Sequence, residues 1–130
     1  YAMRYQIPAM LRAGGGSIVN IASILGAVGF ANSSAYVAAK HGVLGLTQTA
    51  ALEYGQQAIR INAVGPGFIM TPLLEKNLSP EVLTMLAGKH AMGRLGESAE
   101  VAEIVLWLSS DKASFVTGAY FPVDGGYLAQ

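Results

Sequence analysis

A tyrosine and a lysine four residues apart form the first pair in this sequence that could act together in chemistry. Tyr36 and Lys40 fall in a stretch expected to be helical, so their side chains should share one helix face. An ammonium group beside a phenol favours the phenolate, which makes such a tyrosine a competent proton donor or acceptor. Lys40 is also the single charged residue between Ser17 and Leu52, so it must reach solvent or serve a purpose inside the protein.

A serine precedes this pair at the place where a strand is expected to end. Ser23 comes thirteen residues before Tyr36, and the active sites of open α/β sheets lie at the carboxyl ends of strands. Its hydroxyl could hydrogen-bond the carbonyl or alkoxide oxygen of a substrate. A Tyr-x-x-x-Lys spacing alone more often joins a packed tyrosine to a solvated lysine, so the interpretation depends on the serine and on the segments that follow.

The apolar runs and glycines predict strands that alternate with helices. Strands are expected at three short apolar runs, 17–21, 59–64 and 119–123. Helices are expected over residues 1–12, 33–54 and 99–109, with one or two short helices in a flap over residues 71–90. The first strand should be buried on both faces, Pro122 favours an edge strand, and Ser33 or Ser34 and Ser98 should cap their helices. This alternation predicts an α/β fold with a parallel sheet.

Composition narrows the class of protein. The 130-residue chain is 12% charged, against about 25% in typical soluble domains, so much of it should be buried in its own core or against other subunits. Its net charge of zero favours neither nucleic acid nor an anionic membrane surface as a partner. The lack of cysteine excludes disulfides and thiolate metal sites, and it is compatible with a cytoplasmic protein. We expect no metal site.

Two further features of the sequence are a long uncharged run and the pattern in which the chain opens. The uncharged run from Ala13 to Ala39 is long enough to cross a bilayer, but its glycines, serines and asparagines fit a strand, a loop and a helix start better. No membrane segment is therefore expected. The chain opens on Tyr1 inside an amphipathic pattern, which predicts that a helix began upstream and that the sequence is truncated.

Five ordered motifs resemble those of the short-chain dehydrogenase/reductase family. They are Ser23 followed by Tyr36-Val-Ala-Ala-Lys40, then Asn20-Ile-Ala-Ser23, Arg60-Ile-Asn-Ala-Val-Gly-Pro-Gly67, Ile69-Met-Thr71 and Pro122-Val-Asp-Gly-Gly126. The resemblance implies that residues 1–130 are the catalytic, carboxyl-terminal half of one NAD(P)-binding domain with a Rossmann-like doubly wound parallel sheet. The family's glycine-rich phosphate loop, the residue that selects NAD or NADP, and the asparagine of its catalytic tetrad would all lie upstream.

The same resemblance assigns roles to individual residues. Tyr36 would be the general acid/base, Lys40 would favour its phenolate and bind the nicotinamide ribose, and Ser23 would polarise the substrate oxygen. Hydride would move between NAD or NADP and the substrate carbon. The expected cofactor contacts are Pro66 and Gly67 beside the nicotinamide, Ile69 through its backbone and Thr71 through its hydroxyl.

Apolar residues near these motifs predict a pocket for a small secondary alcohol or ketone. They are Leu25, Phe30, Met70, Leu73 and Leu74. A cyclic alcohol, a diol or an acyl ketone would each fit, and some of the flap leucines could instead pack the flap on the body. His41 and His90 are expected to be non-catalytic.

Three functions stay open from the sequence. The first is the oxidoreductase just described; the second is an epimerase or dehydratase of the family's extended subtype; the third is a non-enzymatic assembly or binding module. The family's paired long helices form subunit contacts, so the resemblance also implies a homo-oligomer, a dimer or a tetramer. The chain alone should be inactive, and the missing neighbour of the strand at 17–21 should make it associate.

Overall fold

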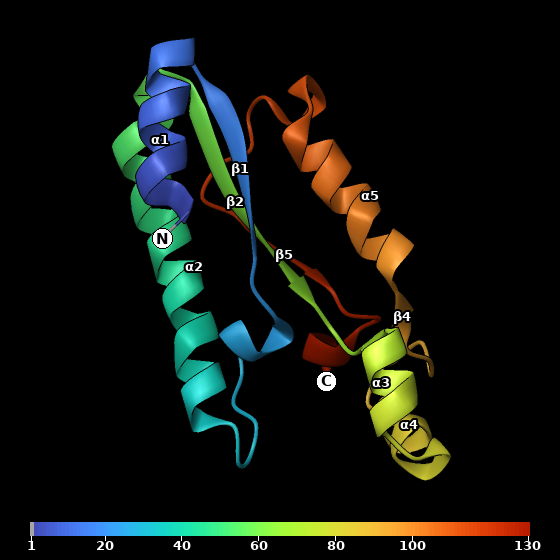
Figure 1. Cartoon of the computed structure of the whole chain (residues 1–130). Helices are drawn as coiled ribbons and strands as arrows, with labels where there is room; N and C mark the ends of the chain where they lie inside the picture. The colour runs from blue at the N-terminus through green and yellow to red at the C-terminus, as the bar shows by residue number, and fades with distance from the viewer. Residues whose placement is uncertain (1) are drawn as a thin grey trace.

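The computed structural model describes residues 2–130, in which three apolar runs form a parallel sheet. The strands are β1 (Gly16–Ile21), β2 (Ile59–Pro66) and β5 (Tyr120–Val123), in the order β1-β2-β5. Ile18 pairs with Ile61, and Ala63 pairs with Tyr120. Because all three strands run the same way, their carboxyl ends meet at one edge of the molecule, the lower end in Figure 1.

Helices cover both faces of this sheet, as a doubly wound fold requires. α1 (Ala2–Ala13) and α2 (Ser34–Tyr54) lie on one face, and α5 (Ser98–Ser109) lies on the other (Figure 1). The first face is sealed by an apolar cluster of Ile7, Ile18, Ala50, Ala51, Ile59 and Ile61. The second is sealed by a smaller cluster of Val64, Leu108 and Ala113. The predicted α/β fold is confirmed.

A small outlying unit follows β2. The two-residue strands β3 (Ile69–Met70) and β4 (Gly96–Glu97) pair in parallel. Between them lie α3 (Pro72–Asn77) and α4 (Pro80–Ala87), each with a proline in its first turn and an oxygen of Thr71 or Ser79 as its cap. The predicted short helices of the flap are therefore confirmed. In the described residues, 2–130, there are also four short 3₁₀ turns: η1 (Ile24–Gly26), η2 (Gly55–Gln57), η3 (Asp111–Ala113) and η4 (Tyr127–Ala129).

Several local predictions needed correction. β2 continues through Gly65 and Pro66 because these residues pair with Pro122 and Val123 of β5. Ser33 occupies the N-cap position of α2 but makes no capping hydrogen bond with its side chain. The N-cap of α5 is Glu97 rather than Ser98. Its backbone N–H donates to the Glu100 carboxylate, 2.8 Å away, so the acidic residues of the first turn organise this helix start.

β1 packs against a cluster on each face of the sheet, through Ile18 and Val19, but it is less buried than expected. Ile18 is its one fully buried residue, and Ile21 is exposed over half of its surface. The reason is position: within residues 2–130, β1 forms one edge of the sheet and pairs only with β2. β5 forms the opposite edge, which confirms the prediction from Pro122.

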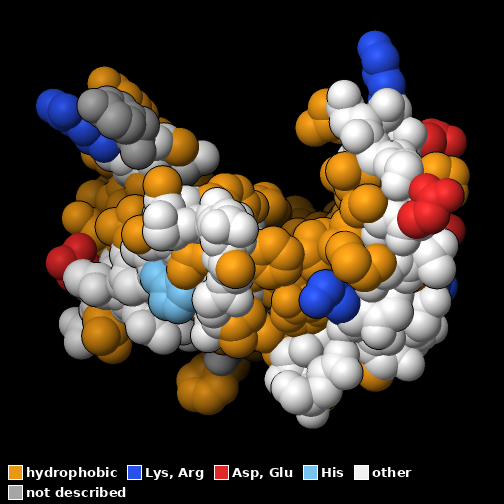
Figure 2. Space-filling view, turned by 90° about the horizontal axis from the view of Figure 1, so that it is seen from below, with side chains coloured by type: hydrophobic (Ala, Val, Ile, Leu, Met, Phe, Trp, Pro, Cys, Tyr) orange, Lys and Arg blue, Asp and Glu red, His pale blue; other side chains and the backbone are white. Residues whose placement is uncertain are grey.

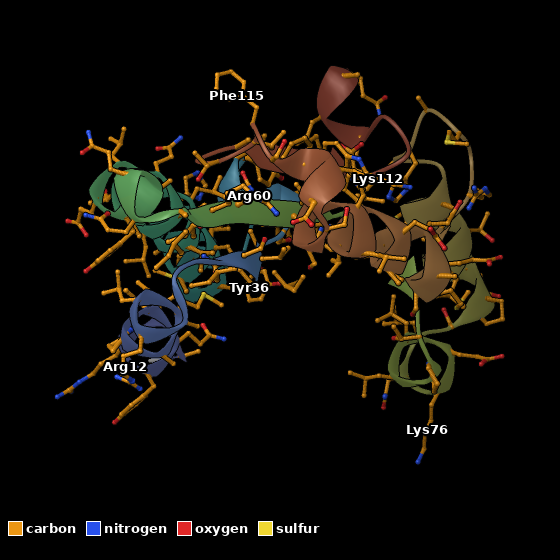
Figure 3. All side chains as sticks on the ribbon, turned by 90° about the horizontal axis from the view of Figure 1, so that it is seen from above. Arg12, Tyr36, Arg60, Lys76, Lys112 and Phe115 are labelled. Carbon is orange, nitrogen blue, oxygen red and sulfur yellow. The ribbon has the colours of Figure 1, made fainter. Side chains whose placement is uncertain are left out.

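One arginine ties β2 to the far helix. The Arg60 guanidinium donates to the carbonyl oxygens of Leu108 at 2.9 Å and Ser110 at 3.0 Å, and Figure 3 shows it reaching from the strand toward α5. Ser17 donates to the same Leu108 oxygen at 2.9 Å. These bonds satisfy carbonyls that the end of a helix leaves without partners. Among residues 2–130, no helix has the length and hydropathy needed to cross a membrane.

Candidate active site

The predicted catalytic lysine lies between the tyrosine and the end of β1. The Lys40 Nζ is 5.5 Å from the centroid of the Tyr36 ring, and it donates a hydrogen bond to the Ile21 carbonyl oxygen at 2.9 Å. The shared helix face is therefore confirmed. Because Ile21 is the last residue of β1, this bond fixes the start of α2 against the strand end. The Tyr36 side chain is 49% exposed, so its hydroxyl can meet a ligand.

Ser23 is fixed by the turn that it begins. It is the N-cap of η1, and its Oγ accepts a hydrogen bond from the Leu25 N–H at 3.1 Å. The turn packs closely on α2, since a Cβ added to Gly26 would lie 3.0 Å from the Lys40 carbonyl oxygen. Ser23 and Lys40 are thus parts of two segments in direct contact. The Ser23 hydroxyl hydrogen remains available to donate to a bound oxygen.

Residues 66–68 form the turn at the end of β2, which we call the β2 turn. Residues near the carboxyl end of the chain pack against it and stabilise it. The Gly67 N–H donates to the Val123 carbonyl oxygen at 3.0 Å. A Cβ on Gly67 would lie 2.9 Å from the His90 Nε2 and 3.0 Å from the Asp124 Cα, so only glycine fits without displacing its neighbours. Asp124 accepts from the N–H groups of Gly126 and Leu128 at 3.0 and 2.9 Å, which stabilises the supporting turn.

Ile69 and Thr71 lead from the β2 turn into the flap. Ile69 belongs to β3, which keeps its backbone extended. The Thr71 Oγ1 accepts from the Leu74 N–H at 3.3 Å and caps α3. Because the hydroxyl accepts in this bond, its hydrogen remains free to donate to a ligand.

A cavity of about 270 Å³ adjoins the β2 turn but does not reach the catalytic residues. Its lining residues include Gly67, Phe68, Ile69, His90, Arg94 and Asp124. Ser23, Tyr36 and Lys40 do not line it. The structure therefore places the predicted catalytic group and the predicted turn at the same edge of the sheet, with this cavity on the side of the turn.

An ion pair closes the rim of this cavity. Arg94 binds Glu100 through two hydrogen bonds, at 2.9 and 2.6 Å. The Arg94 hydrogen bonds, followed by the Glu97 N–H, lower the pKa of Glu100 to about 2, and the same pairing raises the pKa of Arg94. Both side chains are partly exposed, so the pair orders the rim but leaves no unpaired charge there for a substrate anion.

The predicted substrate residues separate into different environments. Leu25 is 8% exposed and belongs to the core, whereas Leu73 is 71% exposed. Phe30 packs edge-on against Phe68 with ring centroids 6.2 Å apart, so the loop after η1 reaches the β2 turn. Met70 lines a second cavity together with α4, and Leu74 is half-buried in α3. Seen from the carboxyl ends of the strands, apolar side chains cover the middle of this face (Figure 2).

His90 supports the β2 turn, which sequence reasoning missed. It is 4% exposed, its Nε2 accepts from the Phe68 N–H at 3.2 Å, and its Nδ1 faces the Leu86 carbonyl oxygen at 2.9 Å. These partners require the proton on Nδ1. Its ring also meets those of Phe68 and Tyr127, at 5.8 and 5.7 Å between centroids. A single histidine in a flap gives no sequence signal for contacts this distant along the chain.

Comparisons with known proteins show the family and the fold of the chain. Residues 1–128 match the family model described as enoyl-(acyl carrier protein) reductase. Over all 130 residues the chain is 54% identical to cyclohexanol dehydrogenase of Acinetobacter sp. (strain SE19), and it covers 50% of that protein. It is 53% identical over 120 residues to cis-4-hydroxycyclohexanecarboxylate dehydrogenase of Sinomonas cyclohexanicum, covering 92% of this chain and 48% of the relative.

Solved structures show the same fold. The structure of ElxO with NADP bound superposes with a TM-score of 0.93 at 39% identity, covering 98% of this chain and 52% of that one. The chain thus spans about half the length of the relatives it matches. The match to the family model over nearly every residue, together with these relatives, shows that the chain belongs to the short-chain dehydrogenase/reductase family.

Proposed function

We propose that this chain supplies the catalytic half of a dehydrogenase that moves hydride between NAD or NADP and a small secondary alcohol or ketone. The observation that carries the proposal is the position of the Lys40 ammonium, 2.9 Å from the carbonyl at the end of β1 and 5.5 Å from the Tyr36 ring. This position places an ammonium group beside a phenol, an arrangement in which a tyrosine can exchange a proton with a substrate oxygen.

Each catalytic side chain has a separate task in this proposal. Tyr36 accepts the alcohol proton during oxidation and returns it during reduction, as a general base and acid. Ser23 donates its free hydroxyl hydrogen to the substrate oxygen, which holds that oxygen near the phenol. Lys40 lies beside the Tyr36 ring, and its bond to Ile21 holds the ammonium at the end of β1.

The donor set at this edge suits a nicotinamide dinucleotide. Lys40 uses one N–H on Ile21 and keeps two for ribose hydroxyls, and Thr71 keeps one O–H for a carbonyl or phosphate oxygen. Pro66 and Gly67 would form the surface beside the nicotinamide, with the Ile69 backbone next to it. Once bound, the dinucleotide would supply or accept the hydride. The ElxO structure with NADP bound supports this assignment.

A cyclic secondary alcohol is the substrate class that we propose. Two relatives with more than half of their matched residues identical are named as dehydrogenases of cyclohexanol and of a hydroxycyclohexanecarboxylate. Phe30, Met70 and Leu73 expose apolar surface near the strand ends, which suits the ring of such an alcohol. No observation favours the epimerase or dehydratase alternative over a dehydrogenase.

We also propose a homo-oligomer that forms through α2. The outward face of this helix carries Gly42 and Gly45, which have open space around them, and the exposed side chains of Leu46 and Leu52. A helix that is apolar away from its own core is normally covered by another helix. The same surface is also compatible with the alternative function, a non-enzymatic assembly module.

The decisive experiment joins this chain to the amino-terminal half of the Acinetobacter cyclohexanol dehydrogenase. This chimera should oxidise cyclohexanol with NAD or NADP. Tyr36→Phe should lower kcat by about 10³-fold, in the range of general acid–base catalysis, without unfolding the protein. His41→Gln, one residue from Lys40 and exposed, is the matched control and should keep full activity. A folded chimera that gives no turnover with any alcohol tested would refute the proposal and favour the assembly module. A fully active Tyr36→Phe would refute the role of Tyr36 as general acid and base.

The chain without an added partner should behave differently. It should show no turnover, because the resemblance places the phosphate loop upstream, and it should associate through the exposed edge of β1. Multi-angle light scattering together with a turnover assay checks both expectations. A monodisperse monomer would contradict the second, and steady turnover by the purified chain would contradict the first.

A further inference from the structure

A tyrosine from the last strand reaches across the sheet to the serine of the candidate active site. Tyr120 opens β5, and β2 lies between β5 and β1. Its hydroxyl nevertheless donates a hydrogen bond to the Ser23 carbonyl oxygen at 3.0 Å. The two residues are 97 positions apart in the sequence, so the bond joins the end of the chain to the turn that carries the serine.

A glycine in the middle strand makes this reach possible. Gly65 is buried in β2, and a Cβ placed on it would overlap the ring and the hydroxyl of Tyr120. The missing side chain therefore leaves a notch through which the tyrosine passes. From the sequence, the strand was expected to end before Gly65, and no role was assigned to this residue. Its close contact with Tyr120 gives it a definite structural purpose.

The hydrogen bond from Tyr120 fills the second acceptor position of the Ser23 carbonyl oxygen. The Ser23 carbonyl oxygen also accepts from the Gly26 N–H at 2.9 Å, so both of its acceptor positions are filled. One partner is local and belongs to η1; the other comes from β5. Together they fix the peptide plane after Ser23, while the Leu25 N–H fixes the Oγ. Partial burial, followed by the charge of Asp124, raises the pKa of Tyr120, so its hydroxyl stays a donor.

On the basis of the proposed dehydrogenase function, we propose that Tyr120 is a positioning residue. It holds Ser23 at a fixed position relative to Tyr36. Without its hydroxyl, the Ser23 carbonyl keeps only its local bond, and the turn can shift relative to α2. A displacement of a fraction of an ångström at a catalytic side chain lowers the rate of the chemical step. The β2 turn has its own supports in His90, Val123 and Asp124, so dinucleotide binding should not change.

The kinetic test uses the chimera described above. Tyr120→Phe removes one oxygen atom and should lower kcat roughly tenfold, as expected for loss of a supporting contact, with the KM for dinucleotide unchanged. In the Ser23→Ala background the same substitution should have almost no further effect, because Tyr120 acts through Ser23. The control is Tyr54→Phe, a half-buried tyrosine at the end of α2. Equal losses of kcat in both backgrounds would show a general structural role and overturn the proposal.

A spectroscopic test does not depend on activity. The chain contains two Ser–Ile steps, at Ser17 and Ser23, so labelling serine carbonyls with ¹³C and isoleucine nitrogens with ¹⁵N yields one signal from each. Tyr120→Phe should move the Ser23 carbonyl signal upfield and leave that of Ser17 in place. An unmoved Ser23 signal would overturn the inference even if the chimera is active. A moved signal in a folded but inactive chimera would confirm the contact and refute the dehydrogenase proposal instead.

A substitution in the notch gives a third result. Gly65→Ala should move the same Ser23 signal, because the added methyl group must displace the Tyr120 ring. In a Tyr120→Leu background, Gly65→Ala should add little, since the shorter side chain leaves room. Independent, additive shifts of the Ser23 signal from the two substitutions would contradict a shared mechanism.

Discussion

The two parts of the candidate site are built in different ways. In the first part, Tyr36 and Lys40 depend on short connections, a helix turn between them and one bond from Lys40 to Ile21, whereas Ser23 is tied to β5 through Tyr120. The β2 turn depends on distant ones, from His90 and from Val123 and Asp124. Chemistry is thus placed on a regular helix, whereas the binding surface is supported by side chains that fill the space beneath it.

This difference predicts where small changes of volume will matter. Gly67→Ala should lower the free energy of unfolding by about 2–3 kcal/mol, because the new methyl group would overpack against the His90 ring and the backbone of Asp124. Urea denaturation of the chimera measures it. Gly55→Ala is the control, since nothing lies within 4 Å of a Cβ there. Equal stability of the two variants would show that the β2 turn accepts a methyl group as readily as a position with open space around it.

His90 allows a test of one hydrogen bond under the β2 turn. His90→Leu should cost about 1–2 kcal/mol of unfolding free energy, because the partly buried Phe68 N–H loses its acceptor, and dinucleotide affinity should fall with it. His90→Gln can place an amide oxygen near the former Nε2 and should restore most of the affinity. Isothermal titration with NADP distinguishes the two. Equal affinity in both variants would mean that ring packing, rather than the hydrogen bond, supports the turn.

The opposite effect is expected on α2. Gly45→Ala should raise the free energy of unfolding by about 0.5–1 kcal/mol, because alanine favours a helix interior and nothing lies within 4 Å of its Cβ. The same methyl group would meet a neighbouring subunit, so the variant should also weaken association. Thermal unfolding and sedimentation measured on one sample check both effects. A more stable variant with unchanged assembly would place the subunit contact on another surface.

The smallest effect concerns the ion pair at the rim of the cavity. Arg94 holds the pKa of Glu100 at about 2, below its usual 4.5. Because the folded-state pKa is depressed, the pair stabilises the fold above the usual value, and this contribution is lost as the pH falls through about 2. An NMR titration of the Glu100 carboxyl carbon should show the low midpoint, and Arg94→Gln should move it upward. A midpoint near 4.5 in the unsubstituted protein would show that the pair does not form in solution.

The sequence alone predicted that Tyr36 and Lys40 lie side by side, and it predicted most of the fold, because both depend on local regularities. The spacing of Tyr36 and Lys40 is one helical turn, and the apolar runs mark strands whose ends differ from prediction by one or two residues. The cap of α5 was misassigned because Ser98 and Glu97 are both competent, and the choice depends on where Glu100 reaches back. His90 and Tyr120 act through partners 22 and 97 residues away, which no spacing rule encodes.

The position of β5 in the chain has a consequence for biosynthesis. Tyr120, Val123 and Asp124 hold the serine and the β2 turn, yet they leave the ribosome after every residue that they support. A nascent chain can form α2 and place Tyr36 beside Lys40 before β5 emerges, because the hydrogen bonds of a helix join residues only four apart. The serine and the binding surface must wait for the closing strand. A premature stop codon before residue 120 would therefore yield a polypeptide with its acid–base pair formed and no site around it.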